Sequence, residues 1–125
     1  MIATKQIRIA LRQYIESLGY PTYGVEFPRV EVASLQMSNG NEKSGQSFVV
    51  NCTLDCITQS DSPLQSYEVV EQVRENIDRV AALVIGYNVD MITLGDMSEI
   101  IEDSESGIIT RQEQPVNFYI SKKVE

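Results

Sequence analysis

The sequence contains no histidine, and its few glycines form no phosphate-binding motif. Without histidine the chain lacks the commonest general base and the usual metal ligand, and it cannot form a Ser-His-Asp or Cys-His arrangement. Gly40 and Gly45 stand between two expected strands, and no Gly-Lys-Ser/Thr follows them. We therefore expect a protein that is not an enzyme, with no catalytic residues, no cofactor and no bound metal.

Long apolar runs are also absent. No stretch approaches the roughly 18 apolar residues of a membrane span, and the first twelve residues lack the pattern of a signal peptide. We expect no membrane partner and a protein that stays in the compartment where it is made. Apolar residues make up 42% and charged residues 22% of the 125 positions, which indicates one domain over residues 1–125 with a core of its own.

Cysteine is scarce, and the two that occur do not suit a disulfide with each other. Cys52 and Cys56 lie four positions apart in an alternating strand pattern, which separates their Cα atoms by about 13 Å. A disulfide needs about 4.4 to 6.8 Å. We interpret them as reduced core residues of a cytosolic protein, and the alternative of a nucleophilic thiol lacks a histidine to lower its pKa.

Basic residues are few as well, with ten Lys and Arg against eighteen Asp and Glu and a net charge of -8. A phosphate backbone should be repelled on average, which disfavours sequence-independent binding of DNA or RNA. The only dense basic spot in the sequence is Lys122 and Lys123.

Apolar residues spaced by three and four positions predict two helices. The first covers residues 4–18, with Thr4 as its N-cap and Gly19 just after its end. The second begins at the capping box Ser62-Pro63-Leu64-Gln65 and runs to about Val84. Its expected buried stripe consists of Tyr67, Val70, Val73, Ile77, Val80, Ala81 and Val84.

Two hairpins are predicted around the second helix. The first joins residues 29–37 and 46–58, and alternate residues of its second arm, from Phe48 to Cys56, should point inward. The order helix, hairpin, helix, hairpin predicts an α+β fold, with an antiparallel sheet of about four strands packed against two helices.

The second hairpin joins residues 90–102 and 108–121 through an acidic tip at residues 102–107. Pro115 lies inside its last arm, which predicts an edge or bulged strand because proline cannot donate to a ladder.

Carboxylates are dense around this tip. Their number allows a cation site or an acid/base pair, but the spacing of a calcium loop is missing, so a solvated hairpin end is the favoured interpretation. The residues are Asp96, Glu99, Glu102, Asp103 and Glu105.

The aromatic residues Tyr20, Tyr23 and Phe27 lie beside prolines in the first long loop. They could stack on a ligand, or they could pin the loop to the core. The second interpretation is favoured.

Five segments carry a resemblance to a known family: helix 7–18, Phe27-Pro28-Arg29-Val30-Glu31-Val32, strand 48–57, helix 69–84 and strand 116–120. In length and order they resemble the tail terminator or tail-completion proteins of long-tailed bacteriophages. The resemblance implies a ring, typically a hexamer, that caps the tail tube and joins the tail to the head. The implied location is the tail or neck of the virion, assembled in the host cytoplasm.

The resemblance also implies the partners: further copies of the chain, the tail-tube protein and the head-tail connector protein, with DNA only as cargo passing through the lumen. It transfers no catalytic residue. We predict protein contacts at two loops, through Asn39, Asn41, Glu42 and Lys43 in the first and Glu102, Asp103 and Glu105 in the second. Two alternatives stay open: another neck or tail component, such as a head-completion or tail-tube protein, and a monomeric cystatin-like module that binds a ligand.

Overall fold

The order of elements follows the order of the patterns in the sequence. The computed structural model describes residues 2–41 and 47–123, and it confirms the α+β class, with five strands and three α-helices. The elements are α1 (Ala3–Ser17), β1 (Arg29–Asn41), β2 (Ser47–Ser60), α2 (Leu64–Glu75), the 3-10 turn η1 (Ile77–Arg79), α3 (Val80–Leu83), β3 (Tyr87–Leu94), β4 (Ser98–Ser104) and β5 (Gly107–Lys122).

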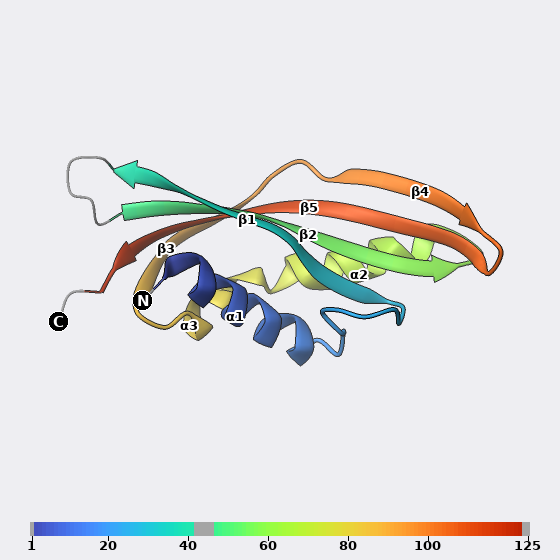
Figure 1. The fold of residues 1–125 in the computed structure, drawn as a ribbon, viewed down its shortest axis with the longest axis horizontal. Helices are drawn as coiled ribbons and strands as arrows, with labels where there is room; N and C mark the ends of the chain where they lie inside the picture. Colours follow the sequence, from blue (N-terminus) through green and yellow to red (C-terminus); the bar gives the residue numbers. More distant parts are fainter. Residues whose placement is uncertain (1, 42–46, 124–125) are drawn as a thin grey trace.

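All five strands join one antiparallel sheet in the order β1-β2-β5-β3, and β4 continues the β3 edge (Figure 1). Residues 108–121 of β5 pair with β2, and on its other side β5 pairs with β4 and then with β3. The arm that contains Pro115 is therefore a central strand, and its register with β2 has no shift, so the prediction of an edge or bulged strand is wrong. The two edges of the sheet are β1 on one side and β3 with β4 on the other.

Pro115 is tolerated in the centre of the sheet because the neighbouring strand is interrupted beside it. Residues 95–97 separate β3 from β4, so the predicted strand 90–102 is in fact two strands. The Gly95 N–H donates to the Pro115 carbonyl at 2.9 Å. In an antiparallel strand the backbone nitrogen and carbonyl of one residue point to the same side. The N–H that proline lacks would therefore have faced the gap between β3 and β4, where it costs no bond of the ladder.

The helices cover one face of the sheet, with α1 against β1 and α2 against β2 and β5 (Figure 1). Helix α1 begins at Ala3 without a side-chain cap, so Thr4 is not the N-cap. Gly19 follows the helix with a φ of 94°, as predicted for a residue that ends a helix in the left-handed region.

The predicted long second helix is interrupted in the structure. Helix α2 ends at Glu75, and the 3-10 turn η1 and the short helix α3 follow it. The Tyr14 hydroxyl donates to the Val73 carbonyl at 2.7 Å. This bond from α1 satisfies one of the carbonyls that the helix leaves open at its end, and Asn76 departs from helical geometry with a φ of -124°.

The core fills the space between the helices and the sheet. Val50, Leu54 and Phe118 are fully buried there, and Cys52 and Cys56 are buried with free thiols, as predicted. The expected stripe of the second helix is buried except for Ala81, which is half-buried, and Tyr67, which is 38% exposed.

Candidate interaction surface

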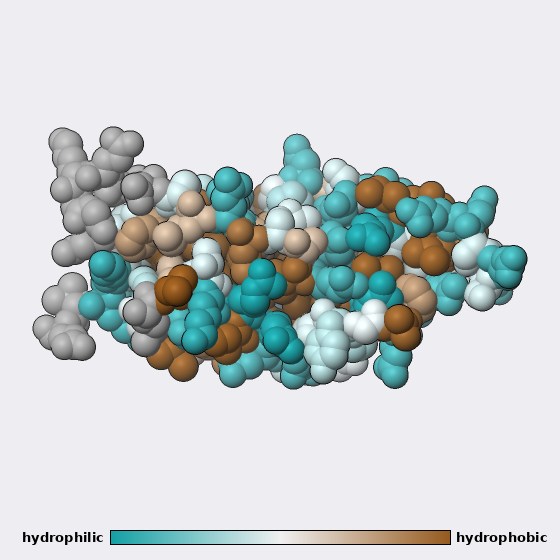
Figure 2. Space-filling view, in the orientation of Figure 1, coloured by the Kyte–Doolittle hydropathy of each residue, from teal (hydrophilic) through white to brown (hydrophobic). Residues whose placement is uncertain are grey.

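Strand β4 is the most exposed element of the sheet. All seven of its residues are exposed, and they include Ile100 at 41% and Ile101 at 51%. Figure 2 shows apolar side chains among hydrophilic ones at this end of the molecule. A strand that lies at an edge and exposes apolar side chains on both faces is a surface that another chain can pair with.

The turn between β4 and β5 is fixed by short polar contacts. The Ser104 hydroxyl donates to the Gly107 carbonyl at 2.6 Å and accepts from the Gln59 amide at 3.3 Å. Gly107 has a φ of 131°, and a Cβ there would lie 3.1 Å from the Ser60 carbonyl oxygen. Glycine is therefore required at this position, because a side chain would prevent the close approach of the acidic tip to the end of β2.

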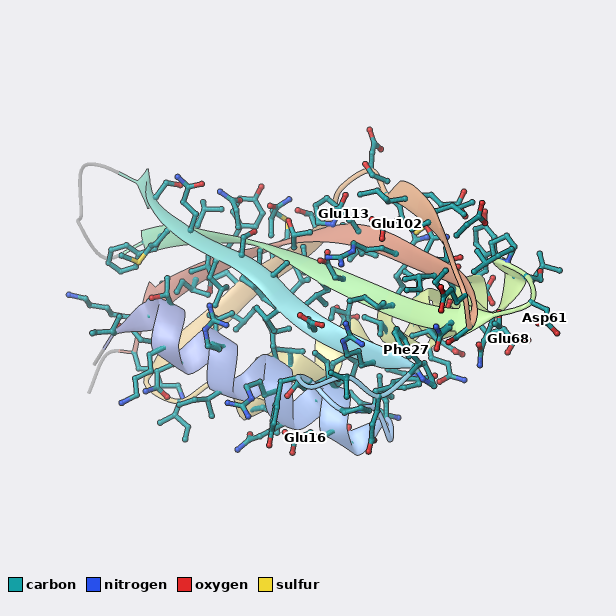
Figure 3. All side chains as sticks on the ribbon, turned by 45° about the vertical axis from the view of Figure 1, so that its right-hand side comes forward. Glu16, Phe27, Asp61, Glu68, Glu102 and Glu113 are labelled. Carbon is teal, nitrogen blue, oxygen red and sulfur yellow. The ribbon has the colours of Figure 1, made fainter. Side chains whose placement is uncertain are left out.

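The side chains of β4 alternate between the two faces of the sheet. Its pairing with β5 places Glu99 and Asp103 on the face that carries the helices, and Glu102 on the open face, where Figure 3 also shows Glu113. Glu99 accepts from the Gln112 amide at 2.9 Å and from the Tyr67 hydroxyl at 3.0 Å.

These bonds tie Glu99 to neighbouring elements. The bond from Tyr67, with the charge of the carboxylate, raises the pKa of the Tyr67 hydroxyl. The carboxylates of Glu102 and Asp103 contact no partner in the described part of the chain, and both residues are exposed, as predicted. Glu105 is exposed in the turn.

The first predicted contact loop lies far from the second. The backbone of Asn39 pairs with Phe48 in β2, and that of Asn41 pairs with Ser47. Glu42 and Lys43 lie outside the described residues. The pairing of β2 runs from this end to the β4–β5 end over fourteen residues, or about 45 Å, so the two loops cannot form one site.

The structure also reveals a basic surface that the sequence reasoning missed. Lys5, Arg8 and Arg12 are exposed on α1. Two shallow hollows between α1 and β1 bring them beside the sheet edge: one of about 380 Å³ is lined by Lys5, Arg8 and Leu35, and one of about 240 Å³ is lined by Arg8, Arg12 and Val32. The signal in the sequence was the spacing of three and four residues, which puts the three side chains on one stripe.

Asp55 and the two cysteines are buried titratable residues of β2. Asp55 is 3% exposed and binds Arg111 at 2.9 Å on the open face of the sheet. Burial raises the pKa of the Asp55 carboxyl, and the hydrogen bond and charge of Arg111 oppose that shift. Burial also raises the pKa of both cysteine thiols to about 12.

Neither thiol is therefore an activated nucleophile. Within residues 2–41 and 47–123, no three His, Cys, Asp or Glu side chains gather closely enough to bind a metal ion. No helix in the same ranges is long and apolar enough to span a membrane.

The loop aromatics divide between the two interpretations. Tyr20 packs against the core, and its hydroxyl donates to the Gln72 side chain of α2, which pins the loop. Tyr23 is 72% exposed and lies against the Arg12 guanidinium, 5.6 Å from the ring centre. Phe27 is half-buried beside Arg29.

No model of a known protein family matches the chain, and no curated protein matches its sequence.

Proposed function

We propose that the protein is a structural subunit of a phage tail or prophage tail, and that its copies form a ring that caps the tail tube. The ring joins the tail to the head connector. The observation that carries the proposal is β4, an edge strand that is exposed along its whole length and includes two exposed isoleucines. A protein that works alone usually blocks such an edge, whereas a subunit covers it with a neighbour.

The arrangement of the sheet suits a ring. Its two edges, β1 and β3–β4, lie on opposite sides of β2 and β5. A contact between two different surfaces of the same chain repeats from copy to copy, and it closes into a ring when the rotation per copy divides the circle. The resemblance to tail terminators, which rests on the order of elements, points to the same assembly.

The chemistry of the chain fits a structural role. The sequence has no histidine, and burial holds the thiols of Cys52 and Cys56 in the neutral form. A net charge of -8 lets DNA pass through a lumen without adhering, because like charges repel.

The alternative of a ligand-binding module receives less support. Such a module needs an apolar pocket between helices and sheet, and Val50, Leu54 and Phe118 fill that space. The hollows in the described residues lie at the surface, as in the loop of residues 21–26.

The test is assembly followed by capping. The purified protein should form closed rings in native mass spectrometry and negative-stain images, and tails that lack their terminator should reach uniform length and join heads when it is added. A protein that stays monomeric and leaves tails uncapped contradicts the proposal. A protein that binds heads but not tails is a head-completion protein instead.

A further inference from the structure

We propose that the acidic β4 edge of one copy docks along the basic β1–α1 edge of the next copy. The acidic edge consists of Glu99, Glu102 and Asp103 on β4, and the basic edge consists of Lys5, Arg8 and Arg12 on α1 beside β1. The proposal rests on the ring proposed above and names the surfaces that build it.

Two edges allow three pairings between copies: β4 with β4, β1 with β1, and β4 with β1. Charge selects the third. Pairing β4 with a second β4 would oppose carboxylates to carboxylates, and pairing β1 with a second β1 would oppose cations to cations. Like charges across a contact cost several kcal/mol, whereas opposite charges fix the partner and the register. Only the contact of β4 with β1 brings opposite charges together, and it is also the only one of the three that extends beyond a dimer.

The cations of the basic edge are available for a partner. The ion pairs of the described residues are Arg29–Glu31 and Arg111–Asp55, so Lys5, Arg8 and Arg12 have no carboxylate partner within residues 2–41 and 47–123. In a chain of net charge -8, these three cations lie on one side of a helix without a carboxylate partner in the described structure, and Arg12 rests on the ring of Tyr23. The apolar part of the same surface includes Ile2, which is 65% exposed.

The backbone of the basic edge is also open. The Val30 N–H donates to the Pro21 carbonyl at 3.0 Å, so the preceding loop covers the start of β1. From Val32 to Ser38 no backbone hydrogen bond of the described structure closes the outer side of the strand. A strand of another copy can add there, as in β-strand addition.

Sheet continuity brings the charges into register. In a ring all copies keep their helices on the same face, so a β4 strand added beside β1 points Glu99 and Asp103 toward α1 of its neighbour. These two residues lie about 13 Å apart along the strand. Lys5 and Arg12 lie about 10 Å apart along their helix, which long side chains can match.

Two charge-reversed variants test the contact: Glu99→Lys with Asp103→Lys on β4, the two carboxylates that face α1, and Lys5→Glu with Arg8→Glu on α1. All four residues are exposed and contact no charged partner in the described structure, so the fold should persist, which circular dichroism checks. The matched control for the β4 variant is Glu68→Lys with Asp78→Lys, which makes the same change of net charge at exposed positions on neither edge.

Each reversed variant alone should lose the assembled species in native mass spectrometry, and the control should keep it. A mixture of the two variants should recover assemblies that contain both, because each variant then meets an opposite charge at both of its edges. Recovery in the mixture is a result that general destabilisation cannot produce.

If the wild type assembles and each reversed variant also assembles on its own, the edge pairing is overturned, while the proposal of a ring stands. Loss in both variants without recovery in the mixture overturns it as well. A wild type that stays monomeric and leaves tails uncapped removes the proposed function and this inference together.

Discussion

Asp55 and Arg111 form a pair in which only one member is buried. The carboxyl is 4% exposed and the guanidinium 39% exposed, and one carboxyl oxygen of Asp55 is buried without a hydrogen bond among the described residues. The pair joins β2 to β5 on the face that no helix covers. Asp55 therefore depends on Arg111 for its charged form.

We predict that Arg111→Met lowers the free energy of unfolding by about 1–3 kcal/mol at pH 7, because it leaves a buried carboxylate unpaired. The pKa of Asp55 is raised in the folded protein, so its neutral form is favoured there and its contribution to stability falls as pH rises. The loss should consequently be smaller near pH 4. Urea unfolding at the two pH values measures it.

The control for this prediction is Arg74→Met, which changes an exposed arginine of α2 and should cost less than about 0.5 kcal/mol. Adding Asp55→Asn to Arg111→Met should restore part of the loss at pH 7. An equal loss at pH 4 and pH 7 would refute the role given to the buried charge.

The buried thiols predict a second pH dependence, at the alkaline end. The pKa of Cys52 and of Cys56 is about 12 in the folded protein, against about 8.5 for an unfolded cysteine. At pH values below the pKa of the unfolded cysteine, the thiols keep their protons in both the folded and the unfolded state. As pH rises from about 9 toward 12 the unfolded state releases it first, so the free energy of unfolding falls.

Replacing both residues by alanine should make the fall between pH 9 and 11 shallower, although the variant is less stable at pH 7 because it leaves cavities. Some alkaline loss should remain, since burial also raises the pKa of Tyr14. Denaturant unfolding against pH measures the slope. An unchanged slope in the double variant would show that the thiols contribute nothing.

At the scale of elements, the central position of β5 depends on the join between β3 and β4. A Cβ at Gly95 would lie 2.9 Å from the Cβ of Pro115 and 3.3 Å from its Cγ. The ring of proline cannot move aside, so the join has room for glycine alone.

We predict that Gly95→Ala lowers the free energy of unfolding by about 1–3 kcal/mol, the usual cost of overpacking. Thermal unfolding measures it, with the exposed neighbour Asp96→Ala as the control. Hydrogen exchange should rise in β3 and β4 more than in β2. A Gly95→Ala variant as stable as the control would mean that the join adjusts freely.

These elements also show what the sequence can predict. The stripe of α1 and the alternation of β2 are visible in the sequence because burial repeats with the period of each element. The interruption of the second helix is not, since the hydrogen bond from Tyr14 to Val73 joins residues 59 positions apart. Nor is the place of Pro115, which depends on a gap in another strand.

The candidate surface divides in the same way. The exposure of Glu102 and Asp103 follows from the polar composition of the hairpin end, which is local information. The position of Arg8 beside the edge of β1 depends on how α1 packs on the sheet, and no pattern within the helix encodes it. Sequence reasoning therefore found the acidic surface and missed the basic one.

At the scale of the whole molecule, a net charge of -8 makes copies of the chain repel one another. Removing negative charge should therefore promote self-association wherever the removed charge makes no attractive contact. The proposed edge contact predicts the opposite sign for β4. We expect Glu99→Gln with Asp103→Asn to weaken assembly, although it lowers the net repulsion.

Sedimentation velocity over a salt series measures this difference. The gap between the neutralised variant and the wild type should be largest at low salt and close toward 1 M, because the screening length falls from about 10 Å at 0.1 M to about 3 Å at 1 M. The matched control, Glu68→Gln with Asp78→Asn, removes the same charge away from both edges and should assemble at least as well as the wild type. If neutralising β4 strengthened assembly to the same extent as the control, its carboxylates would only repel, and they would lie outside the contact between copies.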